Sequence, residues 1–329
     1  MKILRMREVS FNEYLEYVAK HKEIVLEDQV ISLQPVRIKR LAPEPEELTD
    51  VSTTVWSFPR RGSWATHRGD YRGNWAPQIP RALILMYTKP GDIVLDPMMG
   101  SGTTLIEAKL LGRNSIGVDI NYNAVILTLH RLYYLEEALK NLYESTDAKI
   151  EGVDVEDTKK VWYKVYLGDA RKLDLIGDES IDLVATHPPY FNIIKYGDGD
   201  RVDGDLSKTR SLEEYLRWMR DVAREIYRVL RPGKYCAILI GDTRIRKHYV
   251  PISHYVMQVF LDAGFVLKEE VIKIQHKMKT TREVWSRLRK RDFLLIYHEK
   301  LFVFRKPGSR EEIRDLEYSK RLDFLKLDI

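Results

Sequence analysis

A stiff, ring-bearing corner follows a run of strand-forming residues in the middle of the chain. The corner reads ATHPPYFNI (185–193), and the preceding SIDLVATH predicts a buried strand over 180–187. Two adjacent prolines cannot continue a central strand, because neither has an N–H for the ladder. One interpretation is a structural corner with a capping histidine. The other is a pocket that holds a flat ring by its amino group, with acceptors on His187 and the carbonyl of Pro188 and a stacking face on Tyr190.

A glycine-rich turn upstream supplies a second chemical pattern. VLDPMMGSGTTLIEA joins a predicted strand (92–96) to a predicted helix (103–112). Gly100 and Gly102 let the backbone turn tightly and approach a ligand. A dinucleotide fingerprint does not fit, because Leu105 stands where its third glycine belongs, and no Gly-Lys-Ser/Thr follows as a P-loop would require. The turn therefore predicts a ligand without a pyrophosphate.

Acidic residues end the next two predicted strands. Asp119 closes IGVDIN, where it can accept from the hydroxyls of a ribose, and Asp169 lies in LGDA, where it can accept from an adenine amino group. Ordinary strand-end acids are the alternative interpretation of each residue alone. Together with the glycine turn they favour a nucleoside cofactor, and S-adenosyl-L-methionine is a molecule of that kind.

These motifs resemble those of the amino-methyltransferases of nucleic acids, the N4-cytosine and N6-adenine methylases. DPMMGSGTTLIEAKLLGRNSIGVDIN is similar to their cofactor motif, HPPY to their catalytic tetrapeptide, and RGNWAPQIPRALI to the segment that closes over the methionine part of S-adenosyl-L-methionine. The similarity runs from about Trp56 to Lys306. Two departures are the histidine at 187, where the family has Asp, Asn or Ser, and the lack of a sizeable target-recognition domain.

The resemblance implies a class I methyltransferase fold, Rossmann-like α/β, with a doubly wound, mostly parallel seven-stranded sheet and an antiparallel terminal hairpin. It implies a catalytic group formed by His187, Pro188, Pro189 and Tyr190. The implied cofactor-binding residues are Trp75, Pro77, Asp96, Pro97, Met98, Gly100, Gly102, Thr103, Asp119, Ile120, Asp169 and Ala170. The expected substrate-binding residues are Phe191, Arg72, Lys277, Lys279, Arg282 and Trp285.

The order of predicted elements agrees with such a fold. Helices are expected at 103–112, 121–140, 211–230 and 251–264, with a short helix in PRALILMYT (80–88). Strands are expected at 92–96, 114–120, 161–169, 180–187, 234–242 and 265–275, and two more around a tight turn within 293–306. Alternation of strands and helices predicts a mostly parallel sheet.

Two stretches interleave basic and aromatic residues and bear on the substrate. They are WSFPRRGSWATHRGDYRGNW (56–75) and KIQHKMKTTREVWSRLRKRDF (273–293). Lys and Arg can contact phosphates while aromatic rings stack on bases, although a solvated face of a charge-rich protein is the plainer interpretation. DGDRVDGD (198–205) invites a calcium interpretation, but Val202 stands where an oxygen ligand is needed. No metal is therefore predicted, and this loop is expected beside the active site.

The favoured hypothesis is direct in-line methyl transfer to the N4 amino group of cytosine in nucleic acid, without a covalent intermediate, and with ribosomal RNA preferred to DNA. One alternative is a DNA modification methylase acting on cytosine N4 or adenine N6. Another is a non-catalytic nucleic-acid-binding protein that retains the cofactor fold, and methylation of a protein glutamine is a further enzymatic alternative.

Composition limits the remaining possibilities. The chain has 329 residues, a net charge of +5 and one cysteine, so an internal disulfide is excluded. The charged N-terminus and the lack of an apolar run of membrane-spanning length predict a cytoplasmic protein without a membrane partner. Charged residues at 31% are typical of thermophilic proteins. The expected organisation is an N-terminal appendage (1–50), a methyltransferase domain (51–310) and a charged tail (311–329); the oligomeric state stays open.

Overall fold

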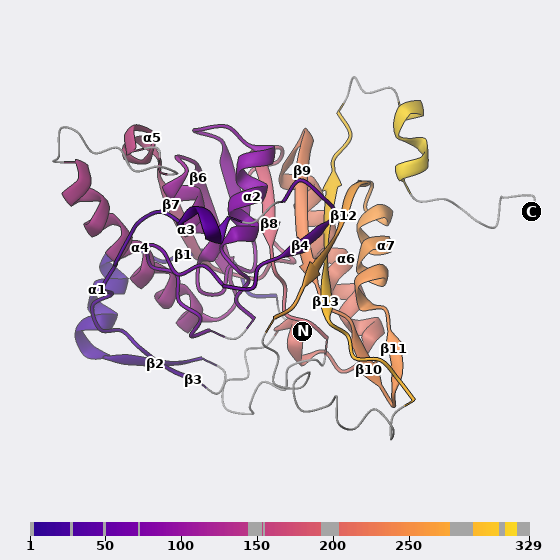
Figure 1. Ribbon diagram of the computed structural model, residues 1–329, viewed down its shortest axis with the longest axis horizontal. Coiled ribbons are helices and arrows are strands. Elements are labelled where there is room, and N and C mark those ends of the chain that lie inside the picture. The colour runs from indigo at the N-terminus through magenta and orange to yellow at the C-terminus, as the bar shows by residue number, and fades with distance from the viewer. Residues whose placement is uncertain are drawn as a thin grey trace, which may run out of the picture.

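The computed structural model describes residues 3–26, 29–48, 51–71, 73–143, 153, 155–191, 204–276, 292–308 and 313–320. Figure 1 shows a central sheet flanked by helices. The sheet is nine-stranded, and its order is β1 (Arg7–Glu8), β7 (Tyr163–Leu167), β6 (Asn114–Asp119), β5 (Ile93–Asp96), β8 (Ile181–Thr186), β9 (Leu230–Ile240), β13 (His298–Arg305), β12 (Val266–Ile274) and β4 (Val55–Ser57).

Helices cover both faces of this sheet. One side is covered by α2 (Gln78–Tyr87), α3 (Thr103–Leu110) and α4 (Tyr122–Tyr143), and the other by α6 (Leu212–Val229) and α7 (Ile252–Asp262). Successive residues of β5 enter different cores, since Val94 packs with α2 whereas Leu95 packs with α6. This two-sided burial explains why the central strands are apolar runs rather than alternating ones.

The chain reverses its winding direction between β5 and β8. From β5 it proceeds outward through β6 and β7, and it then returns to β8 and β9 on the other side of β5. All the neighbouring pairs among these five strands are parallel. Ligands of doubly wound sheets bind at such a switch point, beyond the carboxyl ends of the strands. The predicted doubly wound, mostly parallel sheet is confirmed.

Two details of the predicted sheet are wrong. The sheet has nine strands rather than seven, because the short segments β1 and β4 pair with its two edges. The terminal antiparallel hairpin consists of β12 and β13, and residues 293–297 form no strand before β13. No turn interrupts β13 at Glu299 and Lys300, which continue the ladder and pair with Lys273 and Glu270 of β12, at 2.8 and 3.6 Å.

The N-terminal residues pack against the same sheet. β1 pairs with β7, and α1 (Phe11–Lys20) lies on α4, where the Tyr14 hydroxyl is 3.0 Å from Nδ1 of His130. A hairpin of β2 (Glu23–Leu26) and β3 (Gln29–Ser32) follows. Further small elements are α5 (Val155–Lys160), the hairpin of β10 (Thr243–Ile245) and β11 (His248–Val250), and short 3-10 helices at Pro45–Glu47, Leu206–Lys208 and Ile313–Ser319. The domain boundaries expected near residues 50 and 310 stay predictions.

No helix among the described residues is long and apolar enough to cross a bilayer.

Candidate active site

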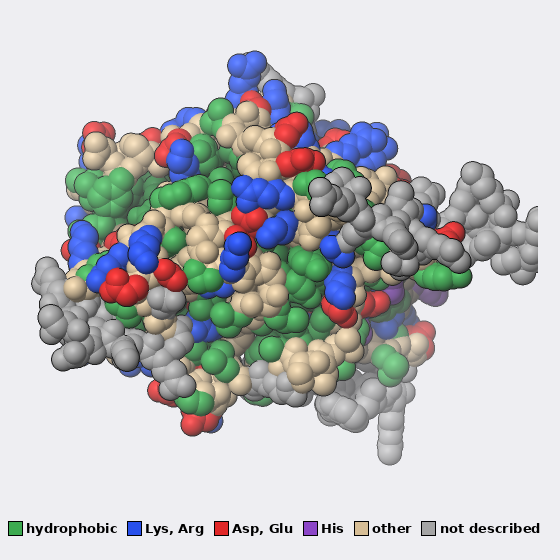
Figure 2. Space-filling model, turned by 90° about the horizontal axis from the view of Figure 1, so that it is seen from above, with side chains coloured by type: hydrophobic (Ala, Val, Ile, Leu, Met, Phe, Trp, Pro, Cys, Tyr) green, Lys and Arg blue, Asp and Glu red, His purple; other side chains and the backbone are tan. Residues whose placement is uncertain are grey.

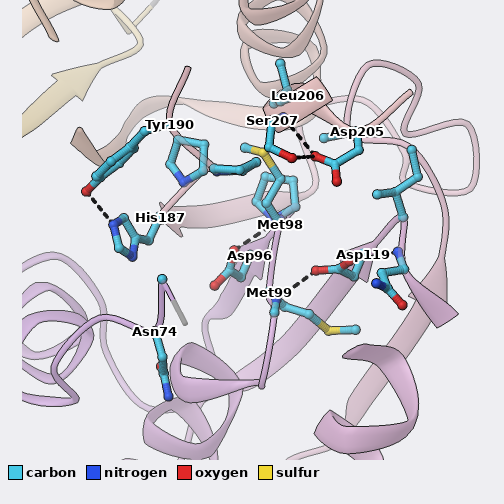
Figure 3. Close-up of a pocket in the computed structure, with 18 of the residues that line it drawn as sticks. Asn74, Asp96, Met98, Met99, Asp119, His187, Tyr190, Asp205, Leu206 and Ser207 are labelled. Atoms are coloured by element: carbon cyan, nitrogen blue, oxygen red, sulfur yellow. Dashed lines mark hydrogen bonds between the residues drawn. The ribbon is translucent and has the colours of Figure 1, made fainter. Parts of the chain in front are cut away.

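A cavity of about 390 Å³ lies at the switch point of the sheet (Figure 3). Its floor comes from the turn after β5 and from the end of β6, and one wall comes from the corner after β8. The segment Gly204–Lys208 closes another side, so part of the acidic loop expected beside the active site does line it. Residues 192–203 of that loop lie outside the described residues.

The glycine turn forms the floor of the cavity. Gly100 has a φ of +52°, and a Cβ atom there would lie 2.8 Å from the ring of Tyr71. Its N–H donates to Oδ2 of Asp119 over 2.8 Å, and its carbonyl accepts from the Thr128 hydroxyl over 2.9 Å. Glycine is therefore needed both for the backbone conformation and for the close approach of neighbouring groups.

Two buried carboxylates face this floor. Asp119 also accepts from the backbone N–H of Asn121 over 2.9 Å, and Asp96 accepts from the hydroxyls of Thr104 and Thr186 over 2.6 and 2.7 Å. Burial raises the pKa of Asp119 to about 7 and that of Asp96 to about 6, although these hydrogen bonds oppose the rise. Such acids favour a ligand that brings hydroxyl donors or positive charge.

Asp169 lies at the end of β7, where the sequence predicts it, but it already has a partner. Arg171 donates to it through its backbone N–H, at 2.9 Å, and through its guanidinium, at 2.5 Å. The guanidinium in turn lies 4.0 Å from the ring centroid of Trp218. Arg171 makes four donor contacts with this carboxylate, two to each oxygen, so an adenine amino group can bind Asp169 only in place of one of them.

A chain of polar side chains runs behind the corner after β8. Nε2 of His187 lies 2.5 Å from the hydroxyl of Tyr190, which donates to Oε1 of Glu299 over 2.9 Å. The other carboxylate oxygen of Glu299 is 2.8 Å from Nζ of Lys273. Burial favours the neutral acid, but the Lys273 ammonium and the hydrogen bonds hold the pKa of Glu299 below its ordinary value. Glu299 is therefore a carboxylate that only accepts.

The second ring nitrogen of His187, Nδ1, is buried and faces the backbone of Gly73, with which it makes no hydrogen bond of good geometry. The Trp75 ring stacks on the imidazole, with centroids 5.9 Å apart and 19° between the planes. Burial lowers the pKa of His187 to about 4, so the ring is neutral at physiological pH. Buried polar atoms normally have partners, so an open Nδ1 marks a place where a ligand group can bind.

The match to a known family covers most of the chain. A model of a family described as DNA methylase matches residues 7–129 and 181–324. The chain belongs to this DNA methylase family. A model of an RMKL-like methyltransferase domain also matches residues 70–198. The predicted amino-methyltransferase family, its class I methyltransferase fold and S-adenosylmethionine as cofactor are thereby confirmed.

Individual relatives of this methylase cover shorter stretches. A tRNA (guanine(10)-N2)-dimethyltransferase of Methanothermobacter thermautotrophicus is 34% identical over 36% of this chain and 29% of its own length. A DNA adenine methyltransferase of Escherichia coli is 39% identical over 30% of this chain and 35% of its own length. The chain thus spans about a third of these curated relatives. A crystal structure of an S-adenosylmethionine-dependent methyltransferase from Methanosarcina mazei covers 69% of this chain and 98% of its own, at 16% identity and a TM-score of 0.41.

Most of the predicted site residues of the methylase line the cavity. They are Trp75, Asp96, Pro97, Met98, Gly100, Thr103, Asp119, Ile120, Asp169, Ala170, His187, Pro188, Pro189 and Tyr190. Gly102 instead begins α3, with a φ of +80°, and packs toward Thr128, while Pro77 precedes α2. Phe191 is buried against Tyr215, with ring centroids 6.0 Å apart. Arg72, Lys277, Lys279, Arg282 and Trp285 lie outside the described residues.

The first basic and aromatic stretch of the methylase is not an open stacking surface. Trp56 and Trp64 are 2% and 0% exposed, and the indole N–H of Trp64 donates to Glu107 over 2.7 Å. Arg61 is half-buried and donates to the carbonyls of Gly62 and Trp75. These residues hold the loop before α2 in place, so the interpretation of this stretch as a nucleic-acid platform is wrong for both tryptophans.

The sequence-based reasoning missed Lys273 and Glu299, which line the cavity from the antiparallel strands β12 and β13. The two residues are directly opposite one another in the ladder. Each of the two predicted segments carries several charged residues, so the sequence offered no signal that singled out this buried pair. Arg171 was missed as well, since it stands only two positions after Asp169, an acid that was assigned to the cofactor.

The cavity of this methylase fits S-adenosylmethionine in size and in chemistry. Its 390 Å³ lie within the usual range of small-molecule sites. Asp119 can accept from ribose hydroxyls while it holds the N–H of Gly100. Asp96 and Asp205 line the same cavity, and their negative charge suits the ammonium and sulfonium groups of S-adenosylmethionine.

Proposed function

We propose that this chain methylates an exocyclic amino group of a base in nucleic acid, with N4 of cytosine as the target and RNA as the preferred substrate. The observation that supports the proposal is Nδ1 of His187, a ring nitrogen at the cavity that makes no hydrogen bond of good geometry and can therefore accept one from a substrate. The absence of a carboxylate at residue 187 favours cytosine over adenine. The similarity to a tRNA methyltransferase supports RNA, whereas the match to the DNA methylase family supports DNA amino-methylation as the second candidate.

His187 and Pro188 would act on the amino group together. The carbonyl of Pro189 is engaged by the Tyr215 hydroxyl at 3.2 Å, whereas within the described structure no hydrogen bond occupies the carbonyl of Pro188. Nδ1 of His187 and this carbonyl can each accept one amino hydrogen, which draws the nitrogen lone pair out of the ring. S-adenosylmethionine, when bound, supplies an electrophilic methyl group on a sulfonium. As the nitrogen gains its new bond, Nδ1 can take the released proton.

The side chains behind His187 select the tautomer that this role requires. The Tyr190 hydroxyl has one proton, and it donates this proton to the Glu299 carboxylate, which has none to give. The hydroxyl oxygen must then accept from Nε2–H of His187, so Nδ1 carries a lone pair. Tyr190, Glu299 and Lys273 are thus positioning residues that keep Nδ1 an acceptor. Because Nδ1 is buried beside the backbone of Gly73, we expect the Gly73–Trp75 segment to move when the substrate binds.

The reaction and its substrate can be tested directly. Labelled S-adenosylmethionine would be supplied with total RNA, duplex DNA and a protein extract, and the modified nucleoside identified by mass spectrometry. Label in N4-methylcytidine of RNA is the expected result. Label in DNA alone would replace RNA with the second candidate, and label in protein or in no fraction would overturn the proposal.

The pH dependence of turnover should show that His187 does not titrate near neutrality. An imidazole with the ordinary pKa of 6.5 would lose its acceptor role below that pH, but burial lowers the pKa of His187 to about 4. We therefore expect kcat, with both substrates saturating, to stay within about twofold from roughly pH 8 down to roughly pH 5.5. A fall of half centred near pH 6.5 would contradict the buried, neutral histidine.

Replacement of Asp119 with alanine should weaken cofactor binding. The carboxylate is expected to accept from the ribose hydroxyls and it also holds the N–H of Gly100. Loss of hydrogen bonds to a charged group should raise the Kd for S-adenosylmethionine roughly 10- to 100-fold, as measured by isothermal titration calorimetry. Asp178→Ala is the matched control, because Asp178 is 74% exposed and pairs with Arg228. Equal Kd values for the two variants would remove Asp119 from the cofactor site.

A further inference from the structure

The hairpin of β10 and β11 continues from the strand that supports the catalytic corner. Gly241, directly after β9, packs so closely on Tyr190 that a Cβ atom there would lie 2.6 Å from the ring. The chain then enters β10, and the two short strands lie at the lower right of Figure 1, beyond the end of β13 where His298 begins. The hairpin therefore projects from the same end of the sheet that carries the cavity.

The tip of this hairpin has an unusual backbone. Ile245 pairs with His248, so Arg246 and Lys247 form a two-residue turn, and their φ angles are +49° and +70°. Turns with both central residues at positive φ are strongly selective for Asn-Gly and similar pairs, because side chains with a Cβ are strained there. Two long cations thus occupy positions where they destabilise the turn. Strain of this kind persists where it serves a function.

The base of the hairpin is firmly anchored. Asp242 accepts from the backbone N–H of Ser253 over 2.7 Å and from the hydroxyls of Ser253 and Tyr249. Arg244 donates to the carbonyls of Leu294 and Lys247, at 2.9 Å each. These contacts hold the two tip cations in a fixed place relative to the cavity.

The charges at the tip are exposed to solvent. Arg246 is exposed, and Lys247, with 63% of its side chain exposed, pairs over 3.2 Å with Asp292, which is 70% exposed. An exposed ion pair of this kind contributes little, so a phosphate can replace Asp292. On the face seen from above in Figure 2, basic and acidic side chains are interspersed.

We propose that Arg246 and Lys247 at the tip of the β10–β11 hairpin bind the phosphate backbone of the nucleic-acid strand that carries the target base. The inference rests on the proposed function. The five residue steps from Gly241 to Arg246 span roughly 16 Å when extended. A stacked strand rises about 3.4 Å per nucleotide, so the tip reaches phosphates roughly five nucleotides from the base held at Tyr190. The hairpin thus supplies affinity along the strand without reading its bases.

The double variant Arg246→Asn/Lys247→Gly tests this role without harm to the fold. It removes both cations and installs the pair that such a turn favours, so the Tm should be unchanged or higher. Binding of fluorescein-labelled 20-nucleotide RNA and DNA single strands would be measured at several salt concentrations. Loss of two phosphate contacts should lower the slope of log K against log salt by about 1.4 and raise the Kd roughly tenfold at low salt.

Two control variants isolate the position of the charge. Lys159→Gln/Lys160→Gln on α5 removes the same net charge at the other end of the molecule, and should leave the Kd and the slope unchanged. Arg246→Lys/Lys247→Arg keeps both charges and should bind normally. Comparison of the RNA and DNA titrations shows which of the two nucleic acids the hairpin binds.

The outcomes separate this inference from the proposed function. If the wild-type chain methylates nucleic acid and the Asn-Gly variant keeps its Kd and salt slope, the hairpin inference is overturned and the function stands. If the variant loses affinity for a 20-mer but not for a trinucleotide, which is too short to reach the tip, the inference is supported. If the wild-type chain neither binds nor methylates any strand, both fail.

Discussion

Replacement of His187 with alanine should abolish methyl transfer while S-adenosylmethionine still binds. The variant loses the acceptor Nδ1, whose lone pair is kept open by Tyr190 and Glu299, and only the carbonyl of Pro188 remains to engage the amino group. Loss of a positioned proton acceptor typically costs between about 100-fold and 10,000-fold in rate. Single-turnover methylation of a nucleic-acid substrate would give the chemical rate, and calorimetry would give the cofactor Kd.

The matched variant is His187→Asn, which places an amide oxygen where the imidazole nitrogen was. An amide oxygen accepts a hydrogen bond but takes up no proton, so part of the rate lost in His187→Ala should return. The two variants together separate the role of His187 in binding the amino group from its role in accepting the proton. Equal loss in the alanine and asparagine variants would point to proton uptake as the main contribution of His187. Near-normal turnover of His187→Ala would remove the residue from the reaction.

The cofactor side of the cavity was predictable from sequence because its geometry is local. Gly100 needs its positive φ within one turn, and Asp96 and Asp119 end strands whose apolar character is evident. In a parallel sheet the carboxyl ends of neighbouring strands meet at one edge, so the order of the motifs along the chain is enough to bring these groups together. The same reasoning placed His187 at the neighbouring strand end.

The support behind His187 was not predictable, because it depends on antiparallel register at long range. Lys273 and Glu299 face one another only because β12 and β13 pair in one register, and a shift by a single residue would put both charges on the other face. Trp64 illustrates the opposite error. Its neighbours are basic, but its indole fits a buried pocket beside Glu107, which no local pattern reveals.

Tyr190→Phe distinguishes a positioning role of Tyr190 from a stacking role. Phenylalanine keeps the ring face that a base would stack on but removes the hydroxyl that accepts from Nε2 of His187 and donates to Glu299. If Tyr190 only stacks, kcat should remain close to that of the wild type. If it fixes the tautomer, His187 is released to donate from Nδ1 toward the backbone of Gly73, and kcat should fall roughly 10- to 100-fold.

The tautomer itself can be observed by 15N NMR of the His187 ring, since protonated and unprotonated ring nitrogens differ widely in chemical shift. In the wild type we expect a proton on Nε2 and none on Nδ1, because the carboxylate of Glu299 takes the only proton that Tyr190 can donate. In Tyr190→Phe the Nδ1 signal should move toward the protonated position. Tyr215→Phe is the control, since it removes a buried hydroxyl from the same corner, bonded to Pro189, without a contact to His187. A wild-type ring protonated on Nδ1 would mean that the imidazole is tied to the loop before α2, and Pro188 would be left as the acceptor that acts on the base.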